Sequence, residues 1–239
     1  MIEAVLLDLD GTLLRFNQEV FVRAYFKELK KVFVKLNVDA DVAVNAVWAG
    51  TKTMALNDGS VLNSERFWHT FSKQMNLYGQ QLKTVEDACN SFYQNEFSSL
   101  KTILPPDGND IGQRIVNTLK KRGVITVLAT NPLFPECAIA TRLSWIGLEV
   151  GDFHLVTSYS NCRYCKPNLK YYTEIFKTIA KAPEQCLMAG NNSSEDMCVG
   201  VLGTKTFFVA EYPEYQEGKC FPSDHRGTLA ELEEFLQSI

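Results

Sequence analysis

Acids, hydroxyls, amides and one lysine stand directly after short apolar runs at four places in the sequence. They are Asp8, Asp10 and Thr12 after AVLL, Thr130 and Asn131 after VITVLA, Lys166 after FHLVTS, and residues 190–196 (GNNSSED) after QCLMA. If these runs are parallel strands, their carboxyl ends meet at one edge of a sheet, where open α/β sheets bind their ligands. The sequence therefore predicts one polar site assembled from four distant segments.

The first of these groups holds two carboxylates, Asp8 and Asp10, only two residues apart. At the end of a buried strand two such charges repel each other and need compensation. A divalent cation would supply it, and Mg²⁺ suits a site with few carboxylates, some waters and a phosphate. The stretch DLDG is also good turn chemistry, so this pair alone indicates either a turn or a site. The three further groups favour the site.

The apolar pattern indicates which elements hold these residues in place. After about residue 110, helix-like and strand-like segments alternate, which favours a mostly parallel sheet flanked by helices. Residues 16–100 instead place apolar residues at helical spacing in about four segments with no strand between them, and the turn PPDG at residues 105–108 follows. We predict an α/β fold with a Rossmann-like core (residues 1–15 and 101–239) and an inserted all-helical cap (residues 16–100).

Local signals within residues 16–100 predict where individual helices begin and break. Asn63 or Ser64 and Thr84 are side chains that can cap a helix N-terminus, and acids follow each of them closely. Gly50 interrupts a helical pattern. We expect either a loop near the site or a plain turn between two helices at that glycine.

Composition narrows the class of protein and its partners. The 239 residues are 46% hydrophobic with a net charge of -4, enough for a sizeable core and without the basic footprint of a nucleic-acid binder. No apolar run approaches the roughly 18 residues that span a membrane, and the N-terminus lacks a signal-peptide pattern. Seven cysteines, an odd number, suggest reduced thiols. We expect a cytoplasmic monomer or homodimer that acts on a small molecule.

Four short motifs resemble those of the haloacid dehalogenase-like hydrolase superfamily. DLDGTLL (residues 8–14) is similar to the first motif of its phosphatase branches, Asp-x-Asp-Gly-Thr. ATN (129–131) resembles the second motif, CKP (165–167) the third, and GNNSSED the fourth, with Asn191 where the first aspartate is usual. The motifs occur in the family's order. A helical insert between the first two matches the cap class of phosphoglycolate phosphatase-like members.

The resemblance implies a catalytic role for three residues. Asp8 would be the nucleophile that forms an aspartyl-phosphate, which divides one difficult displacement into two steps. Asp10 would be the general acid and base that protonates the leaving oxygen and then activates water. Lys166 would neutralise charge on Asp8 and on the transferring phosphoryl group.

The resemblance also implies binding roles. Gly11, Thr12, Thr130 and Asn131 would hold the phosphoryl oxygens together with Lys166. The Mg²⁺ ligands would be Asp8, Asp10 (through its backbone carbonyl), Asn191 and Asp196, with Glu195 as a possible substitute. An amide oxygen can ligate Mg²⁺ but brings no negative charge. We therefore expect Asn191 to bind the metal more weakly than an aspartate would.

The leading hypothesis is a Mg²⁺-dependent phosphohydrolase that cleaves a small phosphate monoester. One alternative is a catalytically weak or non-catalytic regulatory or binding protein on the same fold, which Asn191 favours. Another is a 2-haloacid dehalogenase, which Asp10 disfavours because a halide leaves without needing a proton. The pair Cys162 and Cys165 forms a CxxC with no second pair at zinc-ligand spacing, so we expect neither a metal nor a redox role there.

Overall fold

A computed structural model describes residues 2–105 and 110–238. Within these ranges a six-stranded sheet has the order β3-β2-β1-β4-β5-β6, and every neighbouring pair is parallel. The strands are β1 (Ala4–Leu7), β2 (Ile125–Leu128), β3 (Leu155–Val156), β4 (Cys186–Gly190), β5 (Lys205–Val209) and β6 (His225–Gly227). The predicted α/β fold with a parallel, Rossmann-like sheet is confirmed, whereas β6 was not predicted.

Strand β1 lies at the centre of the sheet, where the strand order reverses. The chain runs outward from β1 through β2 to β3, and then returns to place β4 on the other side of β1. Leu7, the last residue of β1, is in register with Leu128 of β2 and Ala189 of β4. The segments that follow these three strands therefore start at the same edge, at the switch point where open α/β sheets bind ligands.

Alternate residues of β1 face opposite sides of the sheet, and each side is covered by helices. Val5 and Leu7 belong to a core cluster with residues of α5 (Ile111–Lys121) and α8 (Leu229–Ser238). Ala4 and Leu6 belong to a second cluster with residues of α7 (Leu169–Ile179) and of the 3₁₀ segment η4 (Met197–Leu202). Because β1 is covered on both faces, it reads as a continuous apolar run.

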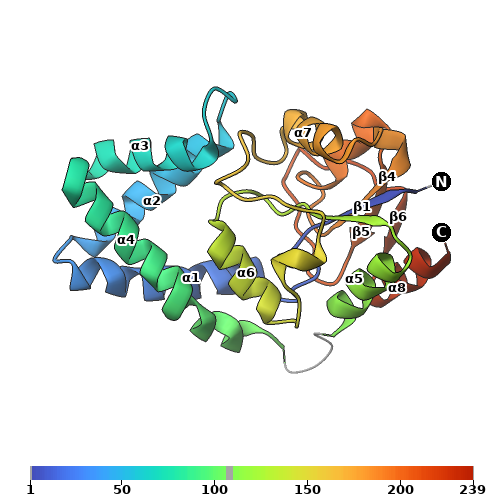
Figure 1. Ribbon diagram of the computed structural model, residues 1–239, viewed down its shortest axis with the longest axis horizontal. Helices are drawn as coiled ribbons and strands as arrows, with labels where there is room; N and C mark the ends of the chain where they lie inside the picture. The colour runs from blue at the N-terminus through green and yellow to red at the C-terminus, as the bar shows by residue number, and fades with distance from the viewer. Residues whose placement is uncertain (1, 106–109, 239) are drawn as a thin grey trace.

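Between β1 and α5, every described element is helical. This helical insert consists of α1 (Gln18–Lys35), α2 (Ala40–Ala55), α3 (Asn63–Met75), α4 (Gly79–Asn95) and the 3₁₀ segment η1 (Phe97–Ile103). Figure 1 shows it beside the sheet, on the side away from both chain termini. In the described part of the chain, no helix combines the length and apolar character needed to cross a membrane.

Helix α6 (Glu136–Ser144) lies where the helical insert meets the core. The ring of Phe134, just before this helix, is 6.0 Å from Phe21 of α1, and the ring of Trp145, just after it, is 5.9 Å from Phe97 of η1. Phe21, Phe97 and Trp145 belong to one buried cluster that also includes residues of the sheet, and the partly buried Phe134 packs against it. The insert therefore packs against the core through aromatic side chains.

Three of the local expectations were wrong. Asn63 is the first residue of α3 and does not cap it, because its side chain instead accepts a hydrogen bond from Asn57 Nδ2 and donates to the Cys165 sulfur. Thr84 lies inside α4, where its hydroxyl donates to the Gln80 carbonyl. Gly50 lies inside α2 without breaking it. Residues 106–108 of the predicted PPDG turn lie outside the described residues.

Gly50 is needed because α2 and α3 approach closely at that point. A Cβ atom there would lie 2.6 Å from the Phe67 ring and 3.2 Å from the Phe67 carbonyl oxygen. We expect Gly50→Ala to lower the free energy of unfolding by about 1–3 kcal/mol, although alanine gains about 1 kcal/mol in helix propensity. Thermal unfolding measures the change. Gly151→Ala is the control, because the nearest atom to its new Cβ would be 3.6 Å away.

An increase in melting temperature for Gly50→Ala would contradict this close packing of α2 against α3.

Candidate active site

The ammonium group of Lys166 joins two acids from different strand ends. Its Nζ donates to Asp8 Oδ1 at 2.9 Å and to Asp196 Oδ1 at 2.6 Å. Asp8 follows β1, Asp196 follows β4, and Lys166 lies in the loop between β3 and α7. Burial by itself would lower the pKa of Lys166, but the two carboxylates outweigh it and hold that pKa well above its usual value. Lys166 therefore stays charged inside the protein.

The side chain of Asn191 is held in a fixed orientation beside Asp8. The Thr12 hydroxyl lies within hydrogen-bond distance of Asp8 Oδ2 (3.2 Å) and of Asn191 Oδ1 (3.3 Å). Asn191 Nδ2 donates to the Tyr212 carbonyl oxygen at 2.5 Å. Gly11 has a φ of +78° and lies close to Asn191: a Cβ atom added to Gly11 would be 2.2 Å from Asn191 Nδ2. An amide therefore suits position 191, because its Nδ2 faces the carbonyl oxygen of Tyr212.

Asp10 pairs with a buried arginine that the sequence reasoning missed. Arg142 of α6 has a side chain only 1% exposed, and its Nη1 donates to Asp10 Oδ2. The guanidinium also lies 4.6 Å from the centre of the Phe134 ring, and its Nε donates to the Ala138 carbonyl. Burial raises the pKa of Asp10, and Arg142 opposes part of that rise. Among the described residues, Asp10 Oδ1 has no hydrogen-bond partner.

These groups surround a small polar cavity of about 60 Å³ at the strand ends. Its lining includes Asp8, Asp10, Thr130, Asn131, Asn191 and Asp196. Asn131 Nδ2 donates to Glu195 Oε2 at 2.9 Å. The Thr130 carbonyl accepts from the hydroxyls of Thr157 and Tyr171 at 2.7 and 3.0 Å, which holds the end of β2 in place. Gly11, Thr12 and Lys166 contact lining residues, so every predicted site residue lies in this region.

Two further acids line the cavity, one of them outside the predicted site. Glu214 belongs to the segment after β5, and its backbone pairs with the loop after β4 through bonds to Asn191 and Ser193. Asn192 Nδ2 donates to Glu214 Oε2 at 3.0 Å. Burial raises the pKa of Glu195 to about 7 and raises that of Glu214. No motif marks Glu214, because only the backbone pairing brings its segment to the site.

The donor set of the cavity suits a hard divalent cation. The lining carboxylates are Asp8, Asp10, Glu195, Asp196 and Glu214. Among the described residues, Lys166 pairs with Asp8 and Asp196, and Arg142 pairs with Asp10. The five carboxylates outnumber these two cations, so an anionic phosphate would meet net repulsion unless further positive charge is present. Asp10 Oδ1 and Asn131 Oδ1 are buried without a partner among the described residues. Oxygen donors of this kind are the ligands that Mg²⁺ prefers.

Acidic side chains alone do not form a ready-made ligand set in the described part of the chain. Among the described residues, no three histidine, cysteine or acidic side chains are already grouped to hold a metal ion. Any Mg²⁺ site here would therefore combine carboxylate oxygens with amide or backbone oxygens and water.

The two cysteines of the CxxC stretch are buried thiols beside this site. Burial raises the pKa of Cys162 to about 12 and also raises that of Cys165. The Cys165 sulfur lies 3.3 Å from Asn63 Nδ2 of the helical insert. Both thiols are free, and a raised pKa disfavours the thiolate that metal binding and redox chemistry require.

Removing the buried charge of Glu195 should change how stability depends on pH. The folded state raises this pKa from 4.5 to about 7. The contribution of Glu195 to the free energy of unfolding therefore falls as the pH rises from about 4.5 through 7, since the buried group must then ionise. In the presence of EDTA, we expect Glu195→Gln to be more stable than wild type at pH 8, by on the order of 2 kcal/mol, and about equal at pH 4. Denaturant unfolding at both pH values tests this.

Glu234→Gln is the control, because Glu234 is exposed on α8 and its replacement removes no buried charge. An equal stability gain at both pH values, or none at pH 8, would contradict the raised pKa of Glu195.

Solved structures with a similar fold include both phosphatases and dehalogenases. A phosphatase from Thermococcus onnurineus superposes with a TM-score of 0.60 at 18% identity, covering 98% of each chain. A hydrolase from Bacillus subtilis, bound to magnesium, gives 0.57 at 19% identity with 98% of each chain covered. A 2-haloacid dehalogenase from Pseudomonas syringae gives 0.66 at 16% identity and covers 100% of this chain and 99% of its own. At such identities these likenesses show the fold alone.

No curated protein matches the sequence. The profile of the haloacid dehalogenase-like hydrolases matches residues 2–197, a span that runs from β1 to the acids after β4 and includes all four motifs. The chain therefore belongs to the haloacid dehalogenase-like hydrolases.

Proposed function

We propose that the protein is a Mg²⁺-dependent phosphatase that hydrolyses a small phosphate monoester through an aspartyl-phosphate on Asp8. The observation that carries this proposal is the buried chain of Asp8, Lys166 and Asp196 beside a cavity that Asp10 also lines. It supplies a nucleophile with a fixed positive charge next to it and a second acid for proton transfer. Phosphoryl transfer depends mainly on such positioning and charge stabilisation.

The two oxygens of Asp8 have different partners. Lys166 binds Oδ1, whereas Oδ2 lies 3.2 Å from the Thr12 hydroxyl. We assign Oδ2 as the attacking atom, since forming a bond to phosphorus there leaves the Lys166 contact intact. As the Oδ2–phosphorus bond forms, the bond from phosphorus to the leaving oxygen breaks, and that oxygen takes a proton from Asp10. Water then loses a proton to Asp10 and attacks phosphorus, which releases phosphate and restores Asp8.

To act as the general acid, Asp10 must hold a proton at the start of the reaction, and the oxygen that carries this proton must face the leaving group. Burial raises its pKa, which favours the protonated form. Arg142 binds Oδ2 and leaves Oδ1 without a partner among the described residues. We therefore assign Arg142 as a positioning residue that orients Asp10 so that Oδ1 carries the proton.

The remaining predicted residues would bind the phosphoryl group and the metal. Thr130, Asn131, Gly11 and Thr12 lie around Asp8 as binding groups for the phosphoryl oxygens. Asp8, the backbone carbonyl of Asp10, Asn191 and Asp196 are the proposed holders of Mg²⁺. When bound, the ion would neutralise charge on the phosphate and on the surrounding acids. The helical insert would act as the cap over this site.

The dehalogenase alternative shares the fold but does not use all of these groups. A halide leaves as an anion, so a dehalogenase has no use for the proton that Asp10 can supply. Here Asp10 is buried, paired with Arg142 and placed in the wall of the cavity. This costly arrangement of buried charge supports chemistry that transfers a proton.

Loss of the nucleophile should abolish turnover. We expect Asp8→Asn to reduce kcat/KM for p-nitrophenyl phosphate with Mg²⁺ on the order of a thousandfold or more, because the amide cannot form the covalent intermediate. EDTA should also abolish the activity of the wild type. Asp87→Asn, at an exposed position of α4, is the matched control and should keep full activity.

Turnover that survives Asp8→Asn would rule out the aspartyl-phosphate mechanism. No turnover by the wild type on a broad panel of phosphate esters would favour a binding or regulatory protein, and chloride release from a 2-haloacid would favour a dehalogenase.

Asn191→Asp should separate metal affinity from stability. A carboxylate brings the negative charge that the amide lacks, so calorimetry should show tighter Mg²⁺ binding. Without metal, the new oxygen would face the Tyr212 carbonyl in place of the donor, which should lower the free energy of unfolding by about 1–3 kcal/mol. Asn45→Asp, at an exposed position of α2, should change neither quantity. Unchanged Mg²⁺ affinity in Asn191→Asp would place Asn191 outside the metal's ligands.

A further inference from the structure

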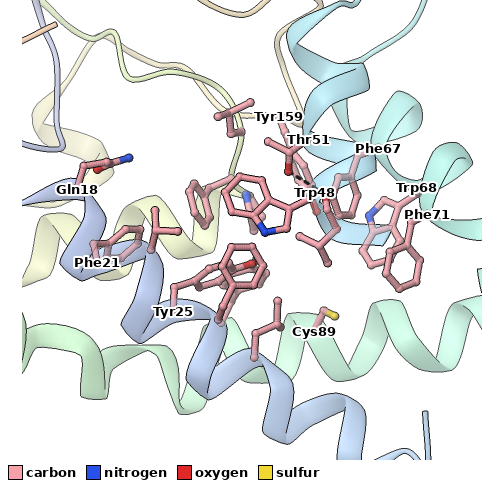
Figure 2. A pocket seen from close by; sticks show the side chains of 18 residues that line it. Gln18, Phe21, Tyr25, Trp48, Thr51, Phe67, Trp68, Phe71, Cys89 and Tyr159 are labelled. Atoms are coloured by element: carbon pink, nitrogen blue, oxygen red, sulfur yellow. Dashed lines mark hydrogen bonds between the residues drawn. The ribbon is translucent and has the colours of Figure 1, made fainter. Parts of the chain in front are cut away.

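A second cavity, of about 210 Å³, lies inside the helical insert where it meets the core. Figure 2 shows Phe21 and Tyr25 of α1, Trp48 of α2 and Phe67 of α3 placed around it. Phe134, which stacks on Arg142, closes it from the side of the core. The walls are therefore mostly aromatic rings that come from α1, α2, α3 and α4 of the insert and from two loops of the core, one before α6 and one after β3.

This aromatic cavity adjoins the polar cavity beside Asp8. Gln18, Leu133 and Phe134 line both cavities. Leu133 and Phe134 closely follow Asn131, a proposed phosphate-binding residue. In Figure 2, Gln18 stands at the end of the cavity opposite Phe71. A molecule with its phosphate beside Asp8 would therefore extend past Gln18 into the aromatic cavity, so this cavity is the natural place for the leaving group.

The polar groups of the aromatic cavity are largely paired with each other. The hydroxyls of Tyr25 and Tyr93 are 2.7 Å apart, and the Thr51 hydroxyl donates to the Val47 carbonyl. Among the described residues that line the cavity, none carries a charge. A sugar or a second phosphate placed here would lose its bonds to water and find few replacements, at a cost of about 1–3 kcal/mol for each hydroxyl. The lining therefore selects against polyhydroxylated and doubly charged substrates.

Size and shape of the cavity favour an aromatic group. Its volume of about 210 Å³ exceeds the roughly 150 Å³ of an engineered apolar cavity that holds one benzene molecule. Aromatic walls contact a ring through stacked and edge-to-face arrangements that contribute about 0.5–1.5 kcal/mol beyond simple burial. One or two fused rings would fit.

We propose that the substrate is a phosphate monoester of an aromatic alcohol with one or two rings, and that its ring occupies the aromatic cavity during hydrolysis. This inference rests on the proposed phosphatase function. The reaction is hydrolysis of the ester: the phosphorus–oxygen bond breaks, the aromatic alcohol leaves with the proton from Asp10, and water supplies the oxygen of the released phosphate.

Esters of alcohols whose leaving oxygen is aliphatic, with and without an aromatic ring, provide the first test, since similar leaving oxygens remove the intrinsic advantage of phenols. We expect kcat/KM with Mg²⁺ to be at least tenfold higher for phenethyl phosphate than for glycerol phosphate or glucose phosphate. If the polar esters are hydrolysed as fast or faster, and Asp8→Asn abolishes that activity, the inference is overturned while the phosphatase function stands.

A pair of variants on α1 tests the cavity itself. Val22 lines the cavity, whereas Val20 is 52% exposed on the same helix and does not line it. Val22→Phe should fill part of the space and raise KM for phenethyl phosphate at least tenfold, while turnover of acetyl phosphate stays within twofold. Val20→Phe should change neither. An equal loss for both substrates in Val22→Phe would show that the cavity serves only packing, and would overturn the inference.

A binding measurement covers the case in which no ester is hydrolysed. The proposed function would then fail, but phenethyl alcohol should still give a saturable change in the fluorescence of Trp48 and Trp68, which line the cavity. That change should be absent in Val22→Phe and present in Val20→Phe. No saturable change in the wild type would overturn the inference, whatever the outcome of the assays.

Discussion

The site depends on the charge of Lys166, buried between Asp8 and Asp196. Two carboxylates at the ends of neighbouring strands would repel each other without it, and an isolated buried ammonium would be far more costly than a paired one. The parallel register of β1 and β4 brings the two acids to one edge of the sheet. The loop after β3 then delivers the lysine between them. Removing Lys166 would leave the two buried carboxylates without the charge that compensates them.

A second buried pair, Arg142 and Asp10, connects the same edge of the sheet to helix α6. The arginine also lies against Phe134, whose ring forms part of the wall of both cavities. The proposed proton donor, the polar cavity and the aromatic cavity are thus connected through one helix and the loop before it. This connection gives a physical reason for the leaving group and its proton donor to lie next to each other. It also makes the helical insert part of the proposed site, since Gln18 begins α1.

The sequence allowed us to predict the site residues whose position follows from the strand that precedes them. Asp8, Asn131 and Asp196 end or follow apolar strands, and parallel pairing then places them together. Sequence reasoning missed Arg142 because a single arginine within an amphipathic helix looks like an ordinary surface residue. Glu214 and the aromatic cavity escaped it because both depend on contacts between segments distant in sequence. Local helix signals such as Asn63 failed where a side chain found a partner across the structure instead of capping its own helix.

Trapping the covalent intermediate addresses the central claim, which is that Asp8 is the nucleophile of a phosphatase. The protein with Mg²⁺ and phenethyl phosphate or acetyl phosphate would be quenched in acid within a single turnover and its peptides examined by mass spectrometry. We predict one added phosphoryl group on the peptide that contains Asp8, absent in Asp8→Asn. Release of phosphate without this adduct at any time in the turnover, or an adduct on a different residue, would contradict the mechanism.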